Sequence, residues 1–136
     1  MNPPPAIPPI YLDTSVLAHA MLGTDPAAAW FAAVSTDRDL MSSTLLRLET
    51  TRLLRRESLS PSLAEPYLRR VALVSINDHT LHVAGTLMPH IKTLDSIHLA
   101  TLLLADPDAT LATHDATMAS VARGLGIDIV DPLAPA

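Results

Sequence analysis

Short apolar runs alternate with longer helix-like segments along almost the whole chain. The strand-like runs lie at 10–12, 39–43, 71–76, 110–113 and 127–130. They are apolar on consecutive positions rather than on alternate ones, which is typical of strands buried on both faces. This order predicts an α/β domain with a parallel sheet and helices on both of its faces.

The segments between these runs have the spacing and the end signals of helices. Pro26 suits the first position of the second helix, Asp78 suits the cap of a later one, and Gly124 and Gly126 end the last. The helices are expected at 14–22, 25–34, 44–57, 60–70, 78–88, 94–105 and 116–125.

Residues 1–9 are rich in proline, which suits neither a regular helix nor a central strand. We therefore expect a flexible or extended leader at 1–9 and a single domain at 10–136, since 136 residues fit one domain. Hydrophobic residues make up 49% of the chain but aromatic residues only 3%, so the core must be aliphatic.

The composition also bears on the compartment and on possible partners. The chain has no cysteine, which excludes disulfides and thiolate metal sites. It has no signal-peptide pattern and no apolar stretch near the ~20 residues of a membrane span. These features predict a soluble cytoplasmic protein that does not enter a membrane.

A formal net charge of −5 argues against nucleic-acid binding that ignores sequence. The arginines are nevertheless concentrated in the middle of the chain, among them Arg52, Arg55 and Arg56. Two interpretations stay open: a solvated helix surface, or a local patch that faces phosphates.

Four acids are the candidate site residues, and two of them follow strands. Asp13 ends the first strand and Asp115 follows the strand that ends at Thr113. Each could simply cap the next helix. Because the carboxyl ends of parallel strands share one edge, the two carboxylates would also approach each other if their strands are central.

The other two acids interrupt apolar helix faces. Glu49 lies among Leu45, Leu46 and Leu53, where a carboxylate needs a partner or a metal. Arg52 or Arg56 could be that partner in a structural salt bridge. Asp95 opens a helix that is apolar almost all round, and it could instead cap that helix.

The histidines give no ligand spacing for zinc. His98 lies one turn after Asp95 and is best interpreted as a hydrogen-bonded core residue. His19, His79, His82, His90 and His114 are dispersed, so a zinc site is not expected. The four acids together form an all-oxygen set that suits Mg²⁺, or Mn²⁺ as a substitute, and such a site favours phosphodiester hydrolysis.

With these residues in place, the chain resembles the PIN-domain proteins, and among them the VapC-type toxins of bacterial toxin–antitoxin pairs. The resemblance covers nearly the whole chain after the leader. The matching stretches are YLDTSVL (11–17), LLRLETTRLLRR (45–56), LDSIHLATLLLA (94–105) and ATHDATMASVARGLGIDIVDP (112–132).

The resemblance implies a three-layer fold with a central parallel sheet of about five strands. It implies that Asp13 and Asp95 hold Mg²⁺ most directly, and that Glu49 and Asp115 complete the site directly or through water. Three hydroxyls would line it, with local capping as the alternative: Ser15, Ser96 and Thr113. The resemblance further implies RNA cleavage, inhibition of translation, a cognate antitoxin and a homodimer.

Other functions remain to be weighed against this one. The Asp13-Thr14-Ser15 triplet lacks the second Asp of haloacid-dehalogenase-like phosphatases, and Lys92 is the only lysine, which argues against a phosphoreceiver domain. A PIN module that binds RNA or protein without cutting, or a PIN nuclease outside toxin–antitoxin systems, stays open. Adjacent Trp30 and Phe31 cannot both face one core, so one could anchor a partner.

Overall fold

The computed structural model describes residue 3 and residues 7–133, and it contains a five-stranded parallel sheet in the order β3-β2-β1-β4-β5. The middle strand β1 pairs on one side with β2 and on the other with β4, where Leu12 lies opposite Ala112. The strands are β1 (Ile10–Leu12), β2 (Leu40–Ser43), β3 (Val71–Val74), β4 (Thr110–Ala112) and β5 (Asp128–Val130). The predicted parallel α/β fold is therefore confirmed.

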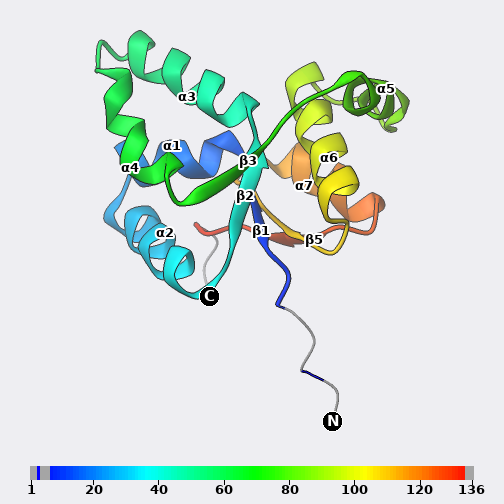
Figure 1. Cartoon of the computed structure of the whole chain (residues 1–136), viewed down its shortest axis with the longest axis horizontal. Coiled ribbons are helices and arrows are strands. Elements are labelled where there is room, and N and C mark those ends of the chain that lie inside the picture. Colours follow the sequence, from blue (N-terminus) through cyan, green and yellow to red (C-terminus); the bar gives the residue numbers. More distant parts are fainter. Residues whose placement is uncertain (1–2, 4–6, 134–136) are drawn as a thin grey trace.

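Helices cover both faces of the sheet, as Figure 1 shows, with α1–α4 on one side and α5–α7 on the other. A short 3₁₀ turn, η1, connects α3 to α4. Their bounds are α1 (Thr14–Leu22), α2 (Asp25–Asp37), α3 (Leu45–Arg56), η1 (Pro61–Ala64), α4 (Glu65–Leu68), α5 (Asp78–Thr86), α6 (Thr93–Ala105) and α7 (Ala116–Gly124).

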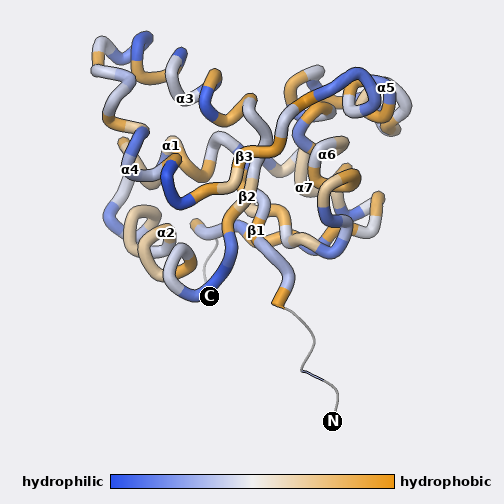
Figure 2. Tube along the Cα trace, viewed as in Figure 1, coloured by the Kyte–Doolittle hydropathy of each residue, from blue (hydrophilic) through white to orange (hydrophobic). Residues whose placement is uncertain are grey.

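Two hydrophobic cores form because successive residues of a strand point to opposite faces. In β1, Ile10 and Leu12 pack with α1–α4, whereas Tyr11 packs with α6 and α7. Both cores are built mainly from leucine, valine, isoleucine and alanine, as the composition predicts. In Figure 2 hydrophilic and hydrophobic residues alternate along α3, which lies at the periphery of its layer.

Several predicted boundaries were wrong for local reasons. The segment predicted as one helix at 60–70 is divided into η1 and α4, which ends at Leu68, and Pro66 falls near the start of the second piece. The cap of α5 is Asn77 rather than Asp78: its side chain accepts a hydrogen bond from the backbone N–H of Thr80 at 3.0 Å. The third strand ends at Val74, two residues early.

The proline-rich segment falls largely outside the described residues, so its predicted flexibility is untested there. Its last part is anchored: the carbonyl of Pro9 accepts from the N–H of Thr110 at 3.0 Å, and that of Pro8 accepts from Arg38 Nε at 3.0 Å. The expectation that Trp30 and Phe31 cannot face one core is wrong. Trp30 is half-buried and packs against the same core as Phe31, because neighbouring residues of a helix lie only about 100° apart around its axis. Within the described part of the chain, no helix is both long enough and apolar enough to cross a membrane.

Candidate metal and nuclease site

The candidate site lies next to β1, where the order in which the chain adds strands to the sheet reverses. From β1 the chain builds the sheet toward β2 and β3 on one side, and later toward β4 and β5 on the other. In open parallel sheets such a switch point leaves a crevice at the carboxyl ends of the strands, which is where ligands bind. Asp13 follows β1 at this edge, and its N–H donates to the carbonyl of Ala112 at 3.0 Å.

Asp13 is held by two hydroxyl groups and is almost fully buried, at 6% exposure. Its Oδ2 accepts from Ser15 Oγ at 2.9 Å and from Thr113 Oγ1 at 2.8 Å. It occupies the N-cap position of α1, yet its side chain makes no capping hydrogen bond. The capping explanation therefore fails for Asp13, and its hydroxyl partners orient the carboxylate within the site.

Asp115 caps a helix and is also linked to Asp13 through Thr113. Its Oδ1 accepts from the N–H of Met118 at 3.0 Å, so it does cap α7. Its own N–H donates to Thr113 Oγ1 at 3.0 Å, and the same hydroxyl donates to Asp13. Thr113 thus connects the two acids that follow neighbouring strands.

Glu49 reaches the site from α3 and is half-buried. Its Oε1 accepts from Thr14 Oγ1 at 2.9 Å and from His98 Nε2 at 2.7 Å. Burial alone would raise the pKa of Glu49, but the hydrogen bond and charge of His98, with the Thr14 hydrogen bond, bring it below its usual value. The predicted salt bridge to Arg52 or Arg56 is wrong.

His98 is the hydrogen-bonded core histidine that the sequence predicts. It is 1% exposed and lies between Glu49 and Tyr11, whose hydroxyl is 2.8 Å from Nδ1. An ionised Glu49 can only accept, so His98 Nε2 donates to it, and in the neutral ring Nδ1 accepts from Tyr11. Sequence reasoning missed Tyr11, Thr14 and the contact between His98 and Glu49, because no local spacing indicates them.

Asp95 is the third residue of α6, where the N-cap position is occupied by Lys92, so the capping explanation is wrong for Asp95 too. Burial raises the pKa of Asp95, and so do the charges of Asp13, Asp115 and Glu49, in that order. His98 acts in the opposite direction. Two helices and two strand ends therefore bring Glu49, Asp13 and Asp115 within electrostatic reach of Asp95.

Ser96 behaves differently from the other two predicted hydroxyls. Its Oγ donates to the carbonyl of Thr93 at 2.6 Å, and the residue lines a separate cavity between α5 and α6. Ser15 and Thr113 contact an acid of the site, whereas Ser96 makes the local backbone bond that was its alternative interpretation.

The chemistry of this donor set fits a hard divalent cation such as Mg²⁺ or Mn²⁺. Asp13, Glu49 and Asp115 are each oriented through one carboxylate oxygen, and within the described residues no hydrogen bond reaches the other oxygen. Such outer contacts are what fixes metal ligands in place. In residues 7–133 no three His, Asp or Glu side chains are already close enough to hold an ion, so the carboxylates would have to move together on binding.

A basic groove begins at Glu49 and follows the outer face of α3. Its volume is about 900 Å³, and it is lined by Leu48, Glu49, Arg52, Leu53, Arg55, Arg56 and Leu94. All three arginines are exposed, and Arg56 Nε lies 3.4 Å from Glu57. The predicted arginine patch therefore lies next to the acids, although the chain as a whole is acidic.

Comparisons with known proteins bear on the fold and the family of this chain. The PIN domain family matches residues 10–129. The chain is 31% identical to Ribonuclease VapC46 of Mycobacterium tuberculosis over 126 residues, which cover 90% of this chain and 97% of that protein.

Solved structures share the fold at lower identity. A toxin–antitoxin complex from Klebsiella pneumoniae contains a chain with TM-score 0.72 and 17% identity, covering 93% of this chain and 99% of that one. VapBC2 from Rickettsia felis, bound to a promoter DNA fragment, gives TM-score 0.67 and 13% identity, covering 89% and 96%. The family match over residues 10–129 and the 31% identical relative show that this chain, with its five parallel strands, belongs to the PIN-domain family and is of the VapC type.

Proposed function

We propose that this protein is a divalent-metal-dependent endoribonuclease that acts as the toxin of a toxin–antitoxin pair. The observation that carries the proposal is the convergence of Asp13, Glu49, Asp95 and Asp115: burial and the charges of the other three acids raise the pKa of Asp95. Carboxylates that repel one another need a cation to stay ionised together near neutral pH.

In this proposal some residues bind the metal ion and others position those ligands. Asp13 and Asp95 would hold the ion most directly, with Glu49 and Asp115 completing the site directly or through water. A divalent cation there, Mg²⁺ or Mn²⁺, would stabilise charge on the scissile phosphate and make a water molecule a better nucleophile. Thr113 and Ser15 keep Asp13 aimed at the site, and His98 and Thr14 do the same for Glu49.

The arginine groove supports an RNA substrate. Arg52, Arg55 and Arg56 lie beside Glu49, where they could contact phosphates on one side of the scissile bond. Ser96 remains a proposed supporting residue, although its hydroxyl is bonded to the backbone. The relative named Ribonuclease VapC46 supports this activity.

The biological role rests on the relatives. Several similar folds come from toxin–antitoxin complexes, which supports a cognate antitoxin as partner of this chain. The proposal also includes a homodimer and a cytoplasmic protein that inhibits translation by cutting RNA.

Cleavage of RNA by the purified chain tests the activity. We expect cutting with Mg²⁺ or Mn²⁺ and none with EDTA, and we expect Asp95→Asn to slow cutting by roughly 100-fold or more, because a bound ion contributes several kcal/mol to the transition state. Asp128→Asn is the matched control, since Asp128 is exposed and begins β5 at the opposite end of the strands. Equal activity of Asp95→Asn and Asp128→Asn would contradict the proposal.

Expression in cells separates the alternatives. A toxin arrests growth when induced, Asp95→Asn does not, and co-expression of the antitoxin restores growth. Cutting without growth arrest would favour a PIN nuclease outside toxin–antitoxin systems. Binding of RNA without any cutting by the metal-loaded protein would favour a non-catalytic PIN module.

A further inference from the structure

Two histidines from distant parts of the chain meet beside the acids without taking part in their contacts. His19 lies in α1, and His114 lies between Thr113 and Asp115 after β4. Their ring centroids are 4.6 Å apart and the planes are inclined by 72°. Nothing in the proposed nuclease chemistry uses either ring.

Each ring is fixed through its Nδ1 atom. His114 Nδ1 lies 2.6 Å from Asp131 Oδ1, and His19 Nδ1 lies 2.9 Å from the carbonyl oxygen of Ser15. A carboxylate and a carbonyl can only accept, so each Nδ1 donates its proton. The Nε2 atom of each neutral ring then carries a free lone pair.

The Nε2 atom of His114 is buried without a hydrogen-bond partner in the part of the chain that the structure describes. Its side chain is only 10% exposed, and Nε2 is the one buried side-chain nitrogen or oxygen among the described residues that lacks a hydrogen-bond partner. Leaving a buried polar atom without a hydrogen-bond partner is destabilising, so the atom calls for a ligand.

The surroundings keep both rings in place. Asp131 is itself held by the N–H of Leu133 at 3.0 Å. The slight burial of Asp131 would raise its pKa, but hydrogen bonds from His114 and Leu133 and the charges of both His114 and His19 lower it. The two rings and Asp131 therefore form one cluster, which we call the histidine pair and its anchor.

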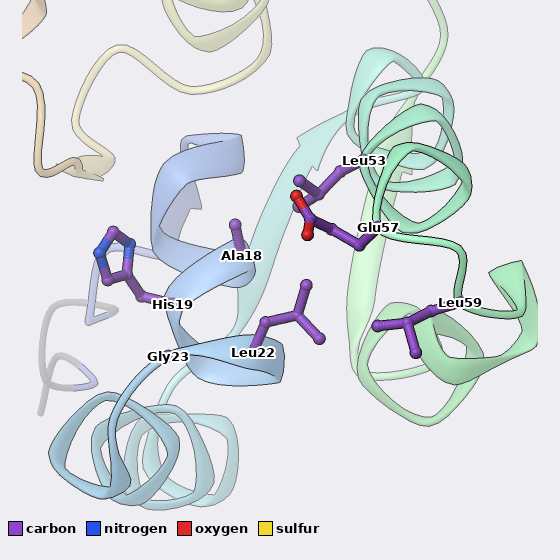
Figure 3. Close-up of a pocket in the computed structure, with 7 residues that line it drawn as sticks. All are labelled: Ala18, His19, Leu22, Gly23, Leu53, Glu57 and Leu59. Carbon is purple, nitrogen blue, oxygen red and sulfur yellow. The ribbon is translucent and has the colours of Figure 1, made fainter.

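His19 also borders an apolar pocket, yet its ring faces away from the middle of that pocket. Figure 3 shows Leu22, Leu53 and Leu59 turned toward the space between α1 and the end of α3, with the His19 ring on the other side of α1. The pocket and the histidine pair are therefore separate features.

We propose that Nε2 of His19 and Nε2 of His114 bind one borderline transition-metal ion, such as Zn²⁺, Co²⁺ or Ni²⁺, with water completing the coordination. Imidazole suits these ions, whereas carboxylates suit Mg²⁺. Metal-binding histidines almost always donate their other N–H to a carboxylate or a backbone carbonyl, as both rings do here. None of the four acids is a ligand of this proposed site, and the proposal does not depend on nuclease activity.

Titration of the purified full-length chain with ZnCl₂ alone, followed by calorimetry, tests this site. The expected result is a site that binds one equivalent of Zn²⁺ and is weakened at least tenfold by His19→Ala and by His114→Gln. We expect Asp131→Asn to weaken it by about 10–100-fold, as for other outer-shell partners. His82→Ala is the matched control, because His82 is exposed on α5.

Nitrogen NMR of the imidazoles supplies a readout that a loss of fold cannot imitate. Zn²⁺ should shift Nε2 of His19 and His114 in the unmutated chain, and these shifts should persist in Asp95→Asn. Zinc binding that is lost in Asp95→Asn but kept in both histidine variants would assign the ion to the acids and overturn the proposal. So would the absence of any shift at the two Nε2 atoms.

Discussion

At the scale of single residues, the negative charge of Asp95 destabilises the metal-free fold. Its pKa lies above the ordinary value of 3.8 because of burial and three neighbouring acids. The folded state therefore binds this proton more tightly than the unfolded chain does. The contribution of the neutral carboxyl to stability is full below about pH 3.8 and is lost as the pH rises through the folded-state pKa.

Asp95→Asn should therefore stabilise the metal-free protein at neutral pH. We expect its Tm in EDTA at pH 7 to rise by roughly a few degrees, since it removes a repelled charge. The difference from the unmutated chain should shrink as the pH falls toward 3.8. Thermal denaturation followed by circular dichroism measures this, and a lower Tm for Asp95→Asn at pH 7 would contradict the electrostatic argument.

His98 instead stabilises the fold, because its ring makes hydrogen bonds with both Tyr11 and Glu49. Tyr11 is fully buried, and burial raises the pKa of its hydroxyl, which therefore stays neutral and bonded to His98. His98→Leu removes His98 as a hydrogen-bond partner of this hydroxyl and should cost about 1–3 kcal/mol in urea denaturation. Adding Tyr11→Phe should restore part of that loss, whereas simple additivity of the two changes would mean that the pair is not coupled.

At the scale of elements, the end of α3 shows how local geometry positions the basic groove. The N–H of Leu59 donates to the carbonyl of Leu54 at 2.8 Å, and the N–H of Ser58 donates to that of Arg55 at 3.0 Å. This is the Schellman arrangement, which requires a left-handed residue after the helix. Ser58 supplies it with φ of 58°, a conformation that glycine adopts without strain.

Ser58→Gly should therefore stabilise the protein by about 1 kcal/mol, since a left-handed L-residue costs roughly 1–2 kcal/mol and glycine loses part of that gain to chain entropy. Ser120→Gly, in the exposed middle of α7, should instead destabilise it by a similar amount. Chemical denaturation of both variants compares the two signs. Destabilisation by Ser58→Gly would contradict the assigned geometry.

At the scale of the whole molecule, the site connects elements that are far apart in the chain. Asp13 follows β1, Glu49 lies in α3, Asp95 lies in α6 and Asp115 caps α7. An ion that binds this set only in the folded state stabilises the entire domain, by about 2.7 kcal/mol at a concentration one hundred times its Kd.

Mg²⁺ should therefore raise the Tm of the unmutated chain in a concentration-dependent way. The increase should be absent in Asp13→Asn, which removes a proposed ligand, and unchanged in Asp128→Asn. Differential scanning calorimetry at increasing MgCl₂ measures it. An equal increase in Asp13→Asn would show that the ion binds elsewhere.

Much of this architecture follows from the sequence alone. Consecutive apolar runs predict the buried strands, and the alternating helices predict a parallel sheet, because only crossover connections join parallel strands. The same reasoning places Asp13 and Asp115 at one edge, and the apolar surroundings of Glu49 and Asp95 mark them as unusual. These inferences need only local periodicity and the geometry of a sheet.

Only the tertiary structure decided which side chains touch. The sequence suggested a salt bridge from Arg52 or Arg56 to Glu49, but packing of α6 against the sheet places His98 in hydrogen-bond contact with Glu49 instead. The spacing of the histidines gave no sign that His19 and His114 meet, because a contact between α1 and the residues after β4 depends on strand order. Sequence periodicity fixes which face of an element is buried, whereas long-range pairing sets the partner, and so the four acids could be named beforehand but their hydrogen bonds could not.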